Sequence, residues 1–258
     1  MNKELFVLLL KGIPIGISNI LPGISGGTIA LVLGVYEEII DALKLMRLRV
    51  LLPVASGAVL GILLTAGLIG GLMEHFPAFM FALIFGLILS SAGITIKDVN
   101  KFNYQAVVSG ICGFLLALGI SANTAAAGNS AIPAVGKVAA AGILGSVSML
   151  LPGISGATML VMIGMYQTML QALTDFNLKI IGVFSISALI GVIGLAWILS
   201  YLLRRHRSVL MAGLSGLIIG SAFAVVPDRF GIAEALGIIM GIVIVLLLTR
   251  VGKIKSYK

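Results

Sequence analysis

Charged residues are scarce in this 258-residue sequence. They make up 10% of the chain, against roughly 25% in a soluble domain, whereas 60% of the residues are hydrophobic. A soluble fold of this size could not bury so much apolar surface, and the mean hydropathy of +1.20 therefore indicates a protein of the lipid bilayer. The net charge of +8 could suggest a nucleic acid partner. Because no basic face coexists with a soluble fold here, we expect no nucleic acid partner.

Cysteine and histidine are almost absent as well. Cys112 is the only cysteine and lies inside an apolar run, which excludes a disulfide framework and a cysteine-based metal site. The only histidines, His75 and His206, lie at predicted helix ends, where neither is placed to serve a serine nucleophile or to act as the nucleophile of a lipid phosphatase. We therefore expect no catalytic residues, no metal and no cofactor, and a protein that is not an enzyme.

Long apolar runs, in contrast, are abundant. Two apolar regions, 4–43 and 132–173, are interrupted near their centres by proline and glycine. Six others are long enough to cross the ~30 Å hydrocarbon core as helices. These six runs are 50–73, 77–96, 104–121, 180–203, 208–227 and 230–249. The sequence therefore predicts an all-α polytopic integral membrane protein.

The two interrupted regions contain the same motif at an offset of 130 residues. The segment Leu-Pro-Gly-Ile-Ser-Gly-Gly-Thr at 21–28 recurs as Leu-Pro-Gly-Ile-Ser-Gly-Ala-Thr at 151–158. Between 21–43 and 151–173, 11 of the 23 positions are identical, and the same offset continues as far as Asp98 and Asp228. We therefore predict two repeats, 1–129 and 130–258, which together form one transmembrane domain.

The basic residues orient these repeats, because Lys and Arg favour the cytoplasmic side. With the loop at 44–49 inside, 14 of the 17 Lys and Arg residues and both termini are cytoplasmic. The equivalent loop at 174–179 is then outside, so the repeats are predicted to be inverted, each with a broken hairpin and three transmembrane helices. Inverted repeats with interrupted helices at corresponding positions are typical of secondary transporters.

Each motif can bind an anion at the start of a helix. Pro22 and Gly23 break the preceding helix, and Ser25 is a predicted N-cap for a helix through 29–43. The unpaired N–H groups at such an N-terminus favour a phosphate or carboxylate. We expect two re-entrant hairpins that aim these N-termini at the membrane centre. The alternative is a tight turn between two full spans, for which arms of about 18 and 20 residues are long enough.

The first motif and its surroundings resemble a known family. Residues 19–28, Asn-Ile-Leu-Pro-Gly-Ile-Ser-Gly-Gly-Thr, followed by Gly34-Val35-Tyr36-Glu37, are similar to the signature of the PopT family of polyprenyl-phosphate transporters, formerly a domain of unknown function. The resemblance covers essentially the whole chain. It implies translocation of undecaprenyl phosphate across the bacterial cytoplasmic (inner) membrane, which recycles the carrier lipid of cell-wall synthesis. The second copy departs from the first, with Met149 and Gln167 in place of Asn19 and Glu37.

The residues and the resemblance together predict a substrate site built from both motifs and Lys11. The candidate substrate-binding residues are Asn19, Pro22, Gly23, Ser25, Gly26, Gly27, Thr28, Pro152, Gly153, Ser155, Gly156, Thr158 and Lys11. Lys11 is either a snorkelling lysine or a counter-charge to the phosphate. Glu37 is either a solvated helix end or a proton-coupling acid.

Other functions stay open at this point. They are a carrier for a small soluble anion and a membrane enzyme that acts on lipid phosphates. The expected partners are a polyprenyl-phosphate lipid and the bilayer. A homo-oligomer is compatible with the sequence.

Overall fold

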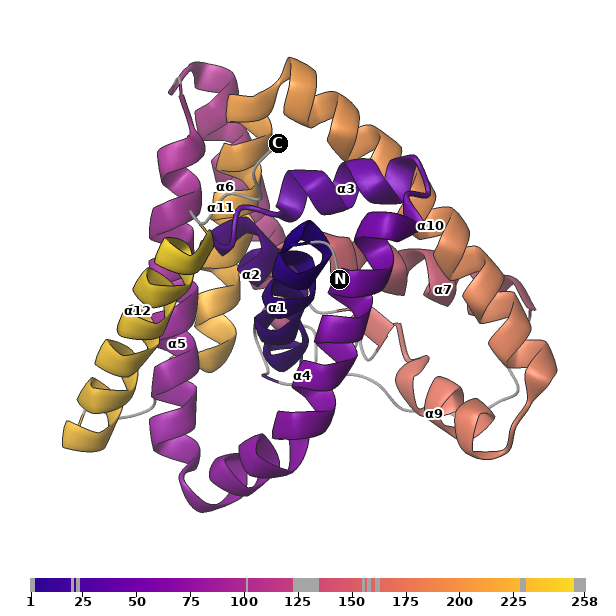
Figure 1. Ribbon diagram of the computed structural model, residues 1–258, viewed down its shortest axis with the longest axis horizontal. Coiled ribbons are helices and arrows are strands. Elements are labelled where there is room, and N and C mark those ends of the chain that lie inside the picture. The colour runs from indigo at the N-terminus through magenta and orange to yellow at the C-terminus, as the bar shows by residue number, and fades with distance from the viewer. Residues whose placement is uncertain are drawn as a thin grey trace.

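The computed structural model describes residues 3–19, 21, 24–100, 102–122, 135–154, 156, 159–160, 163–227 and 231–252, and the secondary structure of these residues is entirely helical (Figure 1). In chain order, the elements are α1 (Lys3–Ser18), α2 (Gly26–Val32), α3 (Tyr36–Lys44), α4 (Leu48–His75), α5 (Pro77–Thr95), η1 (Ile96–Asp98), α6 (Tyr104–Ala122), α7 (Val135–Leu150), α9 (Tyr166–Thr174), α10 (Leu178–Arg205), α11 (Arg207–Ala222), η2 (Phe223–Val225) and α12 (Ile232–Gly252).

Each of the six predicted spans corresponds to one helix, namely α4, α5, α6, α10, α11 and α12. Helices α4, α5, α10 and α12 are by length and composition apolar enough to cross a membrane. The prediction of an all-α polytopic membrane protein is therefore confirmed.

The first interrupted region forms three helices. The predicted single helix through 29–43 is wrong, because Gly34 adopts a left-handed backbone (φ +66°) and separates α2 from α3. In Figure 1, α3 runs crosswise to α4 instead of continuing α2. Helix α2 has only seven residues, about 10 Å of helix, which is far too short to cross the hydrocarbon core. This length supports the re-entrant hairpin, which stays a prediction.

Local structure recurs at the offset of 130 residues. The bounds 36–44 of α3 return as 166–174 in α9, and the bounds 48–75 of α4 return as 178–205 in α10. The left-handed residues recur too: Gly34 and Gly164 have φ of 66° and 67°, and Met46 and Phe176 both have φ of 50°. The corresponding segments thus have the same local conformation. The division at 129/130 and the inversion of the repeats stay predictions.

Small residues set the helix packing. Helix α1 packs against α4, where Cβ atoms added at Gly16 or Gly57 would overlap backbone carbonyls of the facing helix. At the 130-residue offset, α7 packs against α10, with Ser146 and Ser187 at the equivalent positions. Without a hydrophobic drive in lipid, such close backbone approach is a main source of helix association.

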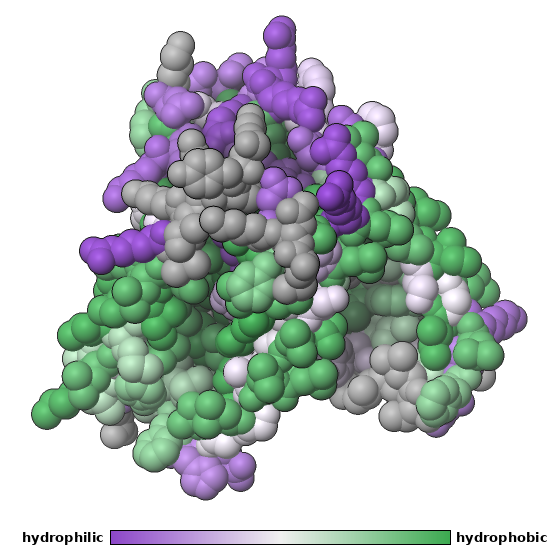
Figure 2. All heavy atoms as spheres, in the orientation of Figure 1, coloured by the Kyte–Doolittle hydropathy of each residue, from purple (hydrophilic) through white to green (hydrophobic). Residues whose placement is uncertain are grey.

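The remaining helices pair across the two halves of the sequence. Helix α5 packs against α12, and α11 packs against α6. Figure 2 shows apolar side chains over the flanks of the molecule and hydrophilic side chains gathered at the end where α3 lies, with a smaller hydrophilic patch at the opposite end. This distribution is that of a bilayer protein with two polar ends.

The close contact of α1 with α4 predicts the effect of one added methyl group. Gly57→Ala places a Cβ against the Leu9 carbonyl, so the helices must separate, and we expect the free energy of unfolding to fall by about 1–3 kcal/mol. Gly67→Ala on the same helix meets no described atom within 4 Å and should be neutral or slightly stabilising. Reversible unfolding in mixed micelles compares the two variants; equal effects would contradict this packing role.

Candidate functional site

The first motif begins α2 with a side-chain cap. Ser25 has an extended backbone (φ −117°, ψ 153°), and its Oγ accepts a hydrogen bond from the Thr28 N–H at 3.3 Å, so the predicted N-cap is confirmed. Both side chains are buried, with exposed fractions of 3% and 1%, and their hydroxyl oxygens lie 3.2 Å apart. The two hydroxyls therefore form one buried polar pair at the start of α2.

This hydroxyl pair holds the second motif. The Gly153 N–H donates to Ser25 Oγ at 3.2 Å and to Thr28 Oγ1 at 3.0 Å, and Ser25 Oγ lies 3.5 Å from the Leu151 carbonyl oxygen. Gly153 is left-handed (φ +86°), and a Cβ there would lie 2.7 Å from the backbone of Leu217. The two breaks, far apart in the sequence, thus meet directly in the interior.

The position before each break differs between the two copies. Asn19 Oδ1 accepts a hydrogen bond from the Gly26 N–H at 3.0 Å, which satisfies one donor at the start of α2. Met149 occupies the equivalent position, and its thioether is only a weak hydrogen-bond acceptor; a Cβ at Gly156 would lie 2.8 Å from Met149 Cγ. The sequence difference therefore replaces the amide acceptor of the first copy by a weak acceptor in the second.

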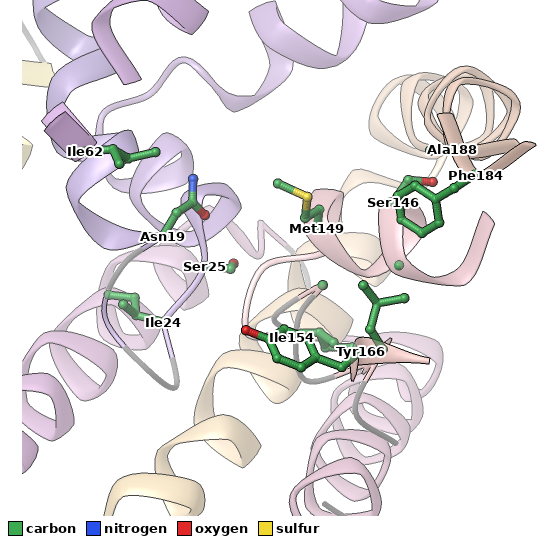
Figure 3. A pocket seen from close by; sticks show the side chains of 13 residues that line it. Asn19, Ile24, Ser25, Ile62, Ser146, Met149, Ile154, Tyr166, Phe184 and Ala188 are labelled. Atoms are coloured by element: carbon green, nitrogen blue, oxygen red, sulfur yellow. The ribbon is translucent and has the colours of Figure 1, made fainter. Parts of the chain in front are cut away.

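Two cavities lie beside the crossing, the place where Ser25 and Thr28 of the first motif contact Gly153 of the second. The larger has a volume of about 430 Å³ and runs between the first break and α9; its polar side chains come from Asn19, Ser25, Ser146 and Tyr166 (Figure 3). The smaller, of about 260 Å³, lies under α3 and includes Gly26 and Gly27 in its wall. Asn19, Ser146 and Met149 line both cavities, so these residues stand between the two spaces.

The structure brings part of the predicted site together. Asn19, Ser25 and Gly156 line the larger cavity, and Asn19, Gly26 and Gly27 line the smaller one. Thr28 and Gly153 lie at the crossing, and Pro152 is buried beside it. Pro22, Gly23, Ser155 and Thr158 lie outside the described residues.

The two predicted charged residues lie elsewhere. Lys11 is buried and donates to the Leu33 carbonyl at 3.4 Å, at the C-terminal end of α2, where a cation is favourable. Glu37 is half-exposed and forms an ion pair with Arg207 of α11. Neither side chain lines either of the two cavities. No group of three or more potential metal ligands occurs among the described residues.

A polar contact closes the end of the molecule at α3. Asp41 accepts hydrogen bonds from Ser200 at 2.8 Å and from Arg204 at 3.0 and 3.1 Å, both on α10. Lys44 donates to Ser200 at 3.4 Å and lies 4.4 Å from the centre of the Trp197 ring. We call the Asp41, Lys44, Ser200 and Arg204 contacts the α3–α10 latch. Glu37 and Asp98 add ion pairs to Arg207 beside it.

The latch also sets the protonation of its carboxylate. Burial alone would raise the pKa of Asp41, but the hydrogen bonds from Ser200 and Arg204, together with the charges of Arg204 and Lys44, lower that pKa below its ordinary value. The carboxylate therefore stays ionised down to a pH below its usual range. The ion pair is present above that range and is lost only as the pH falls through the lowered pKa.

The opposite end has no such contact in the described parts of the chain. Helix α9, the counterpart of α3, packs against α10 and makes no comparable contact with α4. The facing positions of α4 are uncovered: a Cβ added at Gly67, Gly70 or Gly71 would meet no described atom within 4 Å. These three glycines lie 130 residues before Trp197, Ser200 and Tyr201. Among the described residues, contacts thus close the α3 end and leave the α9 end open.

Sequence reasoning missed several of these residues. Ser146 and Tyr166 line the larger cavity but were not among the candidates, although Tyr36 and Tyr166 coincide at the 130-residue offset. That coincidence was the available signal for Tyr166. The sequence contained no signal for the pairing of Asp41 with Arg204, since the two residues are 163 positions apart.

The fold and the cavities define a polytopic membrane protein with an interior site where two interrupted segments cross. The chain belongs to the undecaprenyl phosphate translocase-like family, whose sequence model matches residues 15–51 and 42–235. It is 31% identical to a polyprenyl-phosphate transporter of Vibrio cholerae over 232 residues, which cover 82% of this chain and 74% of that protein. It is 29% identical to a polyprenyl-phosphate transporter of Staphylococcus aureus over 250 residues, 88% of each chain. No solved structure matches the chain.

The shared Gly153 donor predicts non-additive mutations. Ser25→Ala or Thr28→Val alone leaves the Gly153 N–H one acceptor, whereas the double variant leaves it none. An unsatisfied buried donor lowers the free energy of unfolding by about 1–3 kcal/mol more. We expect the loss of unfolding free energy in the double variant to exceed the sum of the single losses.

A matched pair tests this coupling. Ser91 and Thr95 are also buried, but their hydroxyls donate to carbonyls of their own helix, so Ser91→Ala and Thr95→Val should be close to additive. Unfolding free energies of all variants complete both double-mutant cycles. Additivity in the Ser25/Thr28 cycle would contradict the shared hydrogen bond.

Proposed function

We propose that this chain transports a polyprenyl phosphate, with undecaprenyl phosphate as the leading candidate, across the bacterial cytoplasmic membrane for recycling of the carrier lipid. The observation that carries the proposal is the cavity at the crossed motifs, in a chain of the undecaprenyl phosphate translocase-like family. The names of the Vibrio and Staphylococcus relatives, both polyprenyl-phosphate transporters, support the same substrate class.

The chemistry of the cavity suits a lipid phosphate. Its wall is mainly apolar, with the hydroxyls and amide of Ser25, Ser146, Tyr166 and Asn19 at a few positions, and its described lining residues include no Lys or Arg. A phosphate monoester needs hydrogen-bond donors to leave water, whereas its isoprenoid tail can stay in the bilayer. A neutral polar slot beside an apolar wall meets both requirements, and it releases the head group more readily than an arginine cluster would.

The open α9 end and the closed α3 end support transport by alternating access. We propose that the conformation described is one of two states, and that in the other state α9 closes on the glycine face of α4 (Gly67, Gly70 and Gly71) while α3 leaves α10. The latch end contains the basic loops that favour the cytoplasm, so the termini are cytoplasmic and the open end faces outward. The head group then enters from the outer leaflet.

Translocation is measurable in proteoliposomes that contain polyprenyl phosphate in both leaflets. With the protein present, an impermeant phosphatase added outside should consume the inner-leaflet pool as well, whereas empty liposomes retain it. Ser25→Ala combined with Ser155→Ala removes one hydroxyl from each motif, and we expect translocation to slow roughly tenfold or more. The matched control is Ser91→Ala with Ser221→Ala, which removes buried hydroxyls bonded within their own helices.

The same assay separates the alternatives. Release of inorganic phosphate without added phosphatase would indicate a membrane enzyme. Uptake of inorganic phosphate in the absence of polyprenyl phosphate would indicate a carrier for soluble anions. A protected inner-leaflet pool in liposomes with the folded protein would contradict the proposed function.

Cysteine cross-linking tests the two states. In a Cys112→Ala background, Asp41→Cys with Ser200→Cys should cross-link in the described state, and Gly70→Cys with Gln171→Cys, the same positions at the 130-residue offset, should cross-link only in the other state. We expect each cross-link to prevent the other and to stop translocation.

Labelling of the single cysteines provides the control for orientation. An impermeant thiol reagent should reach Asp41→Cys and Gln171→Cys from opposite sides of the membrane. Labelling from one side would contradict the inverted arrangement, and formation of the 70–171 cross-link in molecules already joined at 41–200 would contradict alternating closure.

A further inference from the structure

Two tyrosines occupy equivalent places in the two copies of the motif. Gly34 and Gly164 have nearly identical left-handed backbones, and two residues later Tyr36 begins α3 and Tyr166 begins α9. Because the preceding turns and the following helices have the same bounds at the 130-residue offset, the two tyrosines have the same relation to their own helices. Any difference between them comes from what lies opposite.

The surroundings of the two tyrosine side chains differ. Tyr36 is 3% exposed, and its hydroxyl donates to the Leu150 carbonyl at 3.1 Å, at the end of α7. Tyr166 is 38% exposed and lines the larger cavity. In Figure 3 the Tyr166 hydroxyl points from α9 toward the side of the cavity where Ile154 and Ser25 lie. Tyr36 thus lines the smaller cavity with its hydroxyl already bonded to the backbone, whereas Tyr166 lines the larger cavity.

The other polar groups of the cavity are largely engaged. The Ser146 hydroxyl donates a hydrogen bond to the Ile143 carbonyl within its own helix, and Ser25 Oγ contacts Thr28 and Gly153 at the crossing. Asn19 uses its amide oxygen for Gly26 N–H. In the described part of the chain, the Tyr166 hydroxyl has no hydrogen-bond partner among these groups. It is therefore a donor directed at whatever fills the cavity.

We propose that Tyr166 is a head-group positioning residue, whose hydroxyl donates a hydrogen bond to a phosphate oxygen of the ligand in the larger cavity. The proposal rests on the proposed function and deepens it, because it assigns the recognition of the phosphate monoester to one residue outside the Leu-Pro-Gly-Ile-Ser-Gly segments. A phosphate accepts hydrogen bonds at several oxygens, and a phenolic O–H on a rigid ring offers one donor at a fixed position. The corresponding alcohol of the lipid lacks those oxygens.

The test compares Tyr166→Phe with Tyr36→Phe in purified full-length protein in detergent micelles. Binding of polyprenyl phosphate and of the uncharged polyprenol is measured by titration calorimetry, together with the melting temperature. We expect Tyr166→Phe to weaken polyprenyl phosphate binding roughly tenfold or more, while polyprenol binding and the melting temperature stay unchanged. Tyr36→Phe should lower the melting temperature and keep the preference for the phosphate.

The outcomes separate the two proposals. Inorganic phosphate is then added as a competitor of polyprenyl phosphate. If it competes with the wild-type protein and competes less well with Tyr166→Phe, the Tyr166 hydroxyl contacts a soluble phosphate in the same way as the lipid head group. Equal loss of polyprenyl phosphate and polyprenol binding, or no loss of either, would overturn the role of Tyr166. If the wild-type protein binds polyprenyl phosphate through Tyr166 but does not translocate it, the proposed function fails and the binding role stands.

Discussion

The Gly153 N–H, shared by the hydroxyls of Ser25 and Thr28, is the interaction on which the centre of this protein depends. A helix that breaks inside a bilayer exposes backbone donors and acceptors that lipid cannot satisfy, so such breaks persist only where protein groups pair with them. Here the hydroxyls of the first segment satisfy backbone groups of the second. The contact pairs a backbone donor of the second segment, and both cavities lie beside it.

The two copies share local structure but not their surroundings: among the described residues, α3 is bonded to α10, and α9 makes no comparable contact with α4. The latch joins α3 to α10 through charged and hydroxyl side chains, whereas at the equivalent positions of α4, Gly67, Gly70 and Gly71, an added Cβ would meet no described atom within 4 Å. Tyr36 and Tyr166 differ as well: each lines a cavity, but the Tyr36 hydroxyl is bonded to the Leu150 carbonyl and its side chain is 3% exposed, whereas Tyr166 is 38% exposed. Two segments with the same local structure thus stand in different environments.

Much of the fold follows from the sequence, because apolar length and hydroxyl capping are local properties. The six spans and the Ser25 cap needed only neighbouring residues. The break at Gly34 was missed, since a glycine within a helical pattern is often tolerated and only its left-handed backbone shows the turn. The latch and the role of Tyr166 depend on contacts between distant segments, and an internal repeat in the sequence predicts equal environments where the structure has unequal ones.

The charged latch has a consequence for the response of the protein to its surroundings. Arg204 and Asp41 are partly exposed, with side-chain fractions of 65% and 37%, so mobile ions screen their attraction. The glycine stretch of α4 at the other end offers no side chain for salt to act on. Higher ionic strength at the α3 end therefore weakens the contact between α3 and α10, and among the described residues no comparable ion pair joins α9 to α4.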